Sequence, residues 1–229
     1  MGKIKFYPNT EESLRLGLLL AMVGGFLDAY TYIGRGEVFA NAQTGNIVLL
    51  GIYAAQGRWM HALLVVPPII AFILGVVIAE SIKKSASKGL IPNWAQGVIL
   101  LEMLVLIIVG FVPAGIPDLF VTVTISFIAS VQVSSFRTLI DSPYSSTMCT
   151  GNLRTASKAL FESVVNHDRT AARQSGRFFT IILAFLCGAV LGGILTAHFS
   201  ERSVWAAVLI LAVSFCMLFM DERRTRRAA

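Results

Sequence analysis

Apolar residues in this chain fall into six long runs separated by more polar stretches. The runs cover residues 14–34, 62–80, 96–113, 118–136, 178–198 and 203–220. A helix that crosses a bilayer needs roughly 17–25 mostly apolar residues, and each run reaches that length. The pattern therefore predicts an all-α polytopic integral membrane protein with six spanning helices.

Two further segments, residues 38–55 and 145–163, are less apolar and carry related polar strings. Asn41-Ala42-Gln43-Thr44-Gly45-Asn46 in the first aligns with Thr147-Met148-Cys149-Thr150-Gly151-Asn152 in the second, at an offset of 106 residues. Both strings end in Thr-Gly-Asn. Each segment either crosses the membrane or enters it and leaves on the same side.

The distribution of basic residues distinguishes these two topologies, because cytoplasmic loops of membrane proteins are enriched in Lys and Arg. With re-entrant segments and the N-terminus inside, 16 of the 19 basic residues lie on the cytoplasmic side, and only Arg35, Arg58 and Arg202 lie outside. With both segments spanning, the division is 13 inside and 6 outside. We therefore expect re-entrant or broken segments, with both termini in the cytoplasm.

The order of segments repeats in the two halves of the chain, each reading span, Thr-Gly-Asn segment, span and span. The predicted units are a tail at 1–13, a first repeat at 14–113, a turn at 114–117, a second repeat at 118–220 and a basic tail at 221–229. Three spans are an odd number, so the second repeat enters the membrane from the opposite side. This is the inverted-repeat plan of many transporters. The alternative is eight spans in two parallel repeats.

Composition agrees with a membrane protein and excludes several function classes. Hydrophobic residues form 55% of the chain and charged residues 14%, and the mean hydropathy is +0.73, far above that of a soluble domain. The net charge of +6 is interpreted as a topology signal, and no nucleic-acid partner is expected. The chain has no hydrolase, metalloprotease or nucleotide-binding motif, and its three histidines are scattered. We expect no enzyme activity, no metal and no cofactor.

The Thr-Gly-Asn segments are the first candidate for a functional site. We expect Thr44 to cap a helix that begins at membrane depth, with Gly45 allowing the tight turn. Such a helix directs free N–H groups and the positive end of its dipole at the membrane centre, where Asn46 could form hydrogen bonds. The second segment, with Thr150 and Asn152, repeats the arrangement from the other face. The alternative is that both segments only cap short helices and hold the halves together.

Asp28 is the second candidate, because a carboxyl inside a span costs roughly 2.5–3.5 kcal/mol on insertion scales. It shares one helical face with the small residues Gly17, Ala21 and Gly24. We therefore expect it to point into the helix bundle rather than at lipid. It could carry a proton, bind a cation or pair with an arginine such as Arg35.

The predicted binding site combines these features. Its residues are Asp28, Asn41, Gln43, Thr44, Gly45, Asn46, Gln132, Thr147, Thr150, Gly151 and Asn152. Gln132 is included because it lies in the fourth span, in the region equivalent to Asp28. We expect the asparagines to bind a solute and Asp28 to supply proton coupling or charge selection.

The strings Gly25-Phe26-Leu27-Asp28-Ala29-Tyr30 and Val38-Phe39-Ala40-Asn41-Ala42-Gln43-Thr44-Gly45-Asn46 resemble a known group. They are similar to the YoaK-like family of bacterial inner-membrane proteins, also described as domain of unknown function 1275. The resemblance extends from about residue 12 to residue 220. It implies a protein of the bacterial cytoplasmic membrane and brings no established substrate. For the second half it implies a Gly-x-Gln-Asn-like string, where this chain has Ser130-Val131-Gln132-Val133.

These observations favour a membrane transporter or channel for a small polar solute or ion, with a central site between the two Thr-Gly-Asn segments. The alternative is a non-transporting membrane scaffold or sensor whose polar residues serve helix packing. Membrane lipid surrounds either protein. Small-residue faces on several spans permit a homodimer but do not require one.

Overall fold

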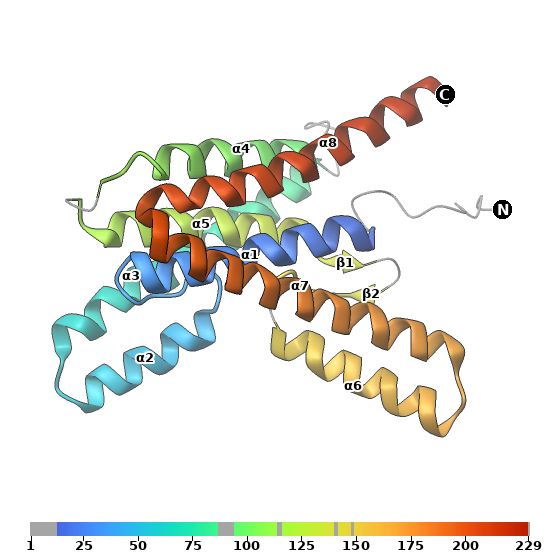
Figure 1. Ribbon diagram of the computed structural model, residues 1–229, viewed down its shortest axis with the longest axis horizontal. Coiled ribbons are helices and arrows are strands. Elements are labelled where there is room, and N and C mark those ends of the chain that lie inside the picture. The colour runs from blue at the N-terminus through green and yellow to red at the C-terminus, as the bar shows by residue number, and fades with distance from the viewer. Residues whose placement is uncertain (1–12, 87–93, 114–115, 140–141, 148, 229) are drawn as a thin grey trace.

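A computed structural model describes residues 13–86, 94–113, 116–139, 142–147 and 149–228, and these residues form a bundle of helices (Figure 1). Its elements are α1 (Leu14–Gly34), α2 (Gln43–Ala55), α3 (Trp59–Ala86), α4 (Trp94–Val109), α5 (Asp118–Ser135), β1 (Thr138–Leu139), β2 (Ser142–Pro143), α6 (Cys149–Val165), α7 (Arg169–Phe199), the 3-10 helix η2 (Ser200–Val204) and α8 (Trp205–Ala228). The two strands form a short antiparallel hairpin that pairs Leu139 with Ser142. The predicted all-helical class is confirmed.

Several helices are long and apolar enough to cross a membrane. Among the described residues, four stretches meet this criterion: Leu14–Gly34, Trp59–Ser85, Asp118–Ser135 and Arg169–Met220. The last stretch has 52 residues and contains α7, η2 and most of α8. The helix α4 is apolar but shorter, with 16 residues. The chain is therefore built as a helical membrane protein.

The helices α2 and α6 differ from the others in length and direction. With 13 and 17 residues, they extend about 20 Å and 25 Å, less than the roughly 30 Å hydrocarbon core. Both begin near the middle of the molecule, and they run toward opposite ends of it (Figure 1). Each then folds back along the next helix, α2 along α3 and α6 along α7.

Tight turns make these returns. Gly57, with φ of 70°, lies between α2 and α3, and His167, with φ of 52°, lies between α6 and α7. Asp168 caps α7 by accepting a 2.7 Å hydrogen bond from the backbone N–H of Thr170. Hydrogen bonds from Thr170 hold the pKa of Asp168 below its usual range.

The closest helix crossing joins α1 to α7, and it depends on glycine. A Cβ atom on Gly188 would overlap the backbone carbonyl of Met22, and one on Gly192 would lie 2.6 Å from the carbonyl oxygen of Phe26. Gly75 gives α3 the same close approach to α5. Small residues allow helix backbones to approach closely and gain van der Waals contact, which drives helix association in lipid.

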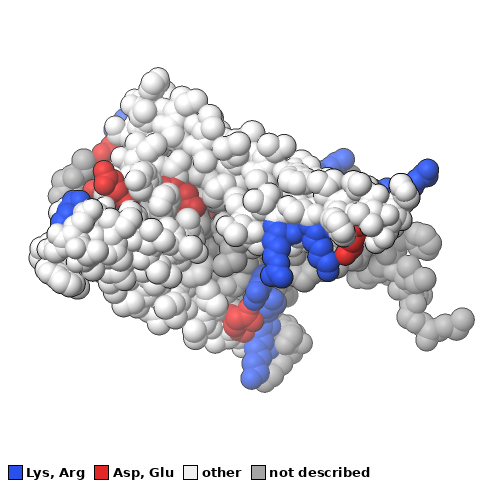
Figure 2. Space-filling view, turned by 90° about the horizontal axis from the view of Figure 1, so that it is seen from below, with Lys and Arg blue, Asp and Glu red and all other residues white. Residues whose placement is uncertain are grey.

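The apolar core lies where α1, α4, α5 and α8 meet. Phe26, Ile99, Leu106, Ile125 and Leu211 are fully buried there. The helix α1 begins and α8 ends at the same end of the molecule (Figure 1). Lys and Arg side chains gather toward that end on the face seen in Figure 2, over α6 and the start of α7.

The start of α2 differs from the sequence prediction. We expected Thr44 to be the N-cap, but α2 begins at Gln43, and its N-cap, Ala42, has no side-chain capping bond. The helix α6 likewise begins at Cys149, so Thr150 lies in its first turn. The predicted threonine caps are therefore wrong, because other side chains hold the preceding loops.

Candidate functional site

The loop before α2 is closed by the side chain of Asn46. Its Oδ1 accepts a 2.9 Å hydrogen bond from the backbone N–H of Phe39, and its Nδ2 donates a 2.8 Å bond to the carbonyl of Phe39. The same Nδ2 also donates to Oε1 of Gln43 at 2.9 Å. The amide thus imitates a strand-like pairing with a residue seven positions earlier, and it is completely buried.

Asn152 closes the loop before α6 in the same way. Its Oδ1 accepts a 3.4 Å bond from the backbone N–H of Ser145, and its Nδ2 donates a 2.6 Å bond to the carbonyl of Ser145. Ser145 also lies seven positions earlier. The two Thr-Gly-Asn segments therefore share a three-dimensional structure as well as a sequence pattern.

Asp28 attaches the first loop to α1. Its Oδ1 accepts hydrogen bonds from the backbone N–H groups of Asn41, at 2.6 Å, and Ala42, at 3.3 Å. Thr31 Oγ1 accepts a bond from the N–H of Ala40 at 3.1 Å, and Asn41 Nδ2 donates to the carbonyl of Gly24 at 3.2 Å. Asp28 is buried, as predicted, and in this arrangement it positions the loop.

The two Thr-Gly-Asn segments meet at one cavity of about 340 Å³. Its lining residues are Asn41, Ala42, Gln43 and Thr44 from the first segment, Thr147, Cys149, Thr150 and Gly151 from the second, and Phe72 and Phe185 from α3 and α7. The second segment fits against α1 because Gly24 has no side chain, since a Cβ there would lie 2.6 Å from the methyl group of Thr147.

Most of the cavity surface is apolar, and polar groups reach it where two helices begin. The first turn of a helix leaves backbone N–H groups without intrahelical partners. The first turns of α2 and α6 both contribute to the lining, through Thr44 on one side and Thr150 and Gly151 on the other. Such positions attract hydrogen-bond acceptors and negative charge.

The structure divides the predicted site residues into two groups. Asn41, Gln43, Thr44, Thr147, Thr150 and Gly151 line the cavity. Of the described residues, Asp28, Gly45, Asn46, Gln132 and Asn152 are not in the lining. Gly45 packs against the ring of Phe39, which lies 2.8 Å from where its Cβ would be. Asp28, Asn46 and Asn152 hold the loops that form the wall.

Gln132 belongs to a different pair. Its Nε2 donates a 2.9 Å hydrogen bond to Oε2 of Glu102, which joins α5 to α4. Both side chains are buried. Within the described part of the chain, Glu102 Oε1 has no hydrogen-bond partner. The equivalence of Gln132 to Asp28 in sequence does not bring it to the cavity.

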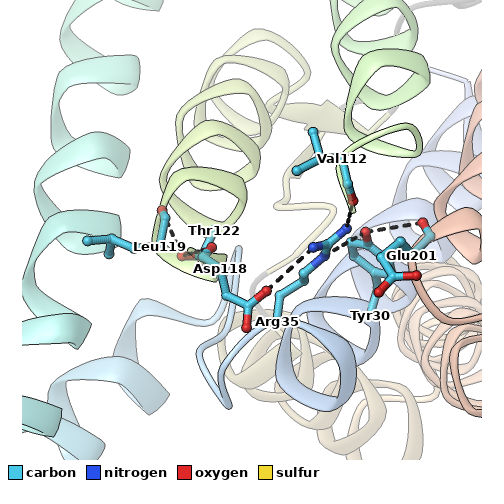
Figure 3. A network of polar contacts seen from close by, with 7 residues as sticks. All are labelled: Tyr30, Arg35, Val112, Asp118, Leu119, Thr122 and Glu201. Carbon is cyan, nitrogen blue, oxygen red and sulfur yellow. Dashed lines mark hydrogen bonds and ion pairs between the residues drawn. The ribbon is translucent and has the colours of Figure 1, made fainter. Parts of the chain in front are cut away.

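A second buried charge is centred on Arg35 (Figure 3), which the sequence analysis considered only as a possible partner of Asp28. Its guanidinium donates to the carbonyl of Val112 at 2.8 Å and to the hydroxyl of Tyr30 at 3.1 Å. It also forms an ion pair with Asp118 at 3.4 Å. Tyr30 in turn donates to the carbonyl of Glu201 at 3.2 Å. Arg35 therefore fastens the end of α1 to the starts of α5 and η2 rather than neutralising Asp28.

No group of three or more His, Cys, Asp or Glu side chains that could hold a metal ion occurs among the described residues.

The chain is similar to proteins already grouped by sequence. Residues 16–217 match the family described as protein of unknown function DUF1275. The chain is 25% identical to the UPF0700 transmembrane protein YoaK of Bacillus subtilis (strain 168) over 214 residues, which cover 90% of this chain and 91% of the relative. No solved structure matches. The match spans both Thr-Gly-Asn segments, and the chain belongs to the DUF1275 family of transmembrane proteins.

Proposed function

We propose that this protein is a transporter or channel for a small polar solute, and that the solute binds in the cavity between the first turns of α2 and α6. One observation carries the proposal: two short helices that extend toward opposite ends of the molecule begin at the same cavity. Irregular backbone at membrane depth is tolerated where it is buried in protein or lines a wet cavity. Discontinuous helices of this kind form the binding sites of many transporters.

The proposed architecture is two inverted repeats, α1–α4 and α5–α8. The helix packing supports it. The two repeats correspond helix by helix: α1 to α5, α2 to α6, α3 to α7 and α4 to α8. Under this correspondence the packing contact between α1 and α7 matches that between α5 and α3, and the contact between α2 and α3 matches that between α6 and α7. Likewise, the contact between α4 and α5 matches that between α8 and α1, and the contact between α4 and α8 matches itself. A transporter built this way moves one repeat against the other around a fixed site.

In this account the cavity residues have two kinds of role. Gln43, Thr44 and Thr150 contact the solute, while Asn46 and Asn152 fix the shape of the loops that carry them. Asp28 acts on the loop through its bonds to Asn41 and Ala42. A change in its protonation would alter these bonds, so it couples proton binding to the shape of the cavity wall.

We place the protein in the bacterial cytoplasmic membrane with both termini in the cytoplasm. The clustering of Lys and Arg at the end where α1 begins and α8 ends supports this orientation.

A non-transporting scaffold or sensor is the second candidate. It is favoured by the asparagine amides, since both are used to close loops rather than facing the cavity. Under this hypothesis the polar residues stabilise the fold and nothing passes through it.

Ligand-dependent thermal unfolding separates the two. Purified protein would be screened in detergent against small anions, weak acids, amino acids, sugars and cations. A solute at about 100 times its Kd stabilises the folded state by roughly 2.7 kcal/mol. A stabilising solute whose effect disappears in Thr44→Val and Thr150→Val, but persists in Thr180→Val on the exposed face of α7, supports transport. If no solute stabilises the protein, or if the shift survives in the cavity variants, the binding site proposed for the cavity is contradicted.

A further inference from the structure

A second cavity, of about 460 Å³, runs along α6 and reaches α7. Its lining residues are Gly151, Arg154, Thr155, Lys158, Ala159, Glu162 and Gln174. It begins in the first turn of α6 and runs along this helix toward the end of the molecule where basic side chains gather (Figure 2). We call it the α6 groove.

The helix α6 has three distinct faces, which explains the groove. Asn152, Ala156 and Ala159 are buried, and the carbonyl of Ala156 accepts a 3.0 Å bond from Ser175 of α7. Apolar side chains, including Leu160 and Phe161, are exposed on another face. The third face carries the polar and charged lining of the groove. A helix that only shielded α7 from lipid would be apolar on all of its outer surface, whereas α6 carries charged side chains on this third face.

The α6 groove meets the cavity between the two Thr-Gly-Asn segments at Gly151, which lines both. A third cavity, of about 610 Å³, lies beside α2 and α3 and is lined by residues that include Glu37, Arg58 and His61. Among the described residues it shares none with the cavity between the segments. The α6 groove therefore begins at a residue that also lines the cavity between the segments, and it runs along α6 toward the basic end of the molecule.

The charges of the α6 groove favour anions. Arg154 and Lys158 contribute two positive charges, and Glu162 contributes one negative charge. Lys158 Nζ lies 3.7 Å from Glu162 Oε1, whereas Arg154 has no ion pair among the described residues. A groove lined by one net sign of charge concentrates solutes of the opposite sign. Beyond Gly151, the starts of α2 and α6 continue the favourable potential.

We propose that the α6 groove is the cytoplasmic access path for a small carboxylate, such as a hydroxy acid or an amino acid. This rests on the proposed transport function and names its substrate class. The carboxylate passes Arg154 and Lys158 and binds at the first turns of α2 and α6. The volume of about 340 Å³ is at the small end of ligand sites.

The test measures uptake of radiolabelled lactate, serine, glycerol and choline into vesicles containing the purified protein, with protein-free vesicles subtracted. We expect saturable uptake of lactate or serine, with competition by propionate, which is also a small carboxylate. Uptake restricted to glycerol or choline would retain transport and overturn the carboxylate class. Absence of saturable uptake for all four solutes would contradict this inference. The proposed transport function would then be tested by the thermal screen, in which a solute that stabilises the protein through the cavity would still support it.

A matched pair of double variants tests the path. Arg154→Gln with Lys158→Gln removes the two positive charges of the groove. Arg169→Gln with Arg173→Gln removes two exposed positive charges of neighbouring α7, at positions that line neither cavity. We expect kcat/KM for the carboxylate to fall about tenfold or more in the first pair and less than about twofold in the second. Equal effects of the two pairs would overturn the path.

Vesicle composition distinguishes a transported anion from a lipid headgroup, because both would bind the same basic side chains. The assay is run in phosphatidylcholine alone and with added phosphatidylglycerol. We expect the defect of the groove variant in both. A defect that appears only with phosphatidylglycerol would mean that the groove holds an anionic lipid, and would overturn the inference.

Discussion

Asn46 and Asn152, which are 106 positions apart, make the same pair of hydrogen bonds. Each amide accepts from the N–H and donates to the C=O of the residue seven positions earlier, Phe39 in one half and Ser145 in the other. A three-residue string can recur by chance, but a recurring loop geometry is much harder to obtain by chance. The Thr-Gly-Asn pattern is therefore a structural unit that starts a short helix.

Removing either amide should destabilise the protein. Asn46→Ala leaves the N–H and C=O of Phe39 without this partner, and we expect a loss of about 2–3 kcal/mol, because each lost bond contributes about 0.5–1.5 kcal/mol. Asn152→Ala, with two bonds rather than three, should lose less. Thermal unfolding in detergent measures both. Asn166→Ala, at an exposed position, is the control, and an equal loss there would contradict the role of the amides.

Glycine at the crossing of α1 and α7 gives a test within one helix. Gly188→Ala places a methyl group against the backbone of Met22, and we expect a loss of about 1–3 kcal/mol from overpacking. In Gly176→Ala, also in α7, the new methyl group meets no atom of the described residues within 4 Å. This change should stabilise the helix by about 0.5–1 kcal/mol. Unfolding temperatures of the two variants that shift in the same direction would refute the packing argument.

The Arg35–Asp118 pair should show measurable coupling. Asp118 is 42% exposed, whereas Arg35 is buried, so Asp118→Asn should cost only about 1 kcal/mol after discounting for solvent. Arg35→Gln should cost more, because the carbonyl of Val112 also loses its donor. A double-mutant cycle by thermal unfolding should give a coupling of at least about 0.5 kcal/mol. Strict additivity of the two changes would mean that the pair contributes nothing.

The proposed orientation predicts opposite labelling of α2 and α6. In a cysteine-free background, Arg58→Cys at the end of α2 should react with an impermeant thiol reagent in intact cells. Lys158→Cys on α6 should react only after the cells are opened. Cysteine replacing Arg202, at the same end as Arg58 in the proposed topology, is the control. Labelling of both Arg58→Cys and Lys158→Cys from outside would contradict the assignment of sides.

The hydrophobic pattern predicts the order of most helices along the chain. It does not predict where a helix ends when that end lies outside an apolar run. The predicted spans at 14–34 and 118–136 agree with α1 and α5 to within one residue. The predicted span at 178–198 misses the first turns of α7, which begins at Arg169. Residues 169–177 are polar but helical, because they pack along α6. The length of an apolar run therefore indicates how much of a helix lies in an apolar environment, and not the full length of the helix.

The candidate site was predictable in its segments but not in the roles of their side chains. The repeat of Thr-Gly-Asn indicated two segments that now share a cavity. The partners of Asn46 and Asp28 are backbone groups, which have no sequence signature. Arg35 and Asp118 are 83 positions apart, and only the packing of α1 against the start of α5 brings them together.

The central claim is that a solute occupies the cavity between the first turns of α2 and α6. It is tested most directly by uptake into vesicles after the cavity is filled. Thr150→Trp places a large ring on an exposed lining position, and Ser157→Trp places the same ring on an exposed position of α6 that lines neither cavity. For the solutes that stabilise the purified protein, we predict that uptake is lost in Thr150→Trp and retained in Ser157→Trp, with similar unfolding temperatures. Equal uptake by the two variants would contradict the account.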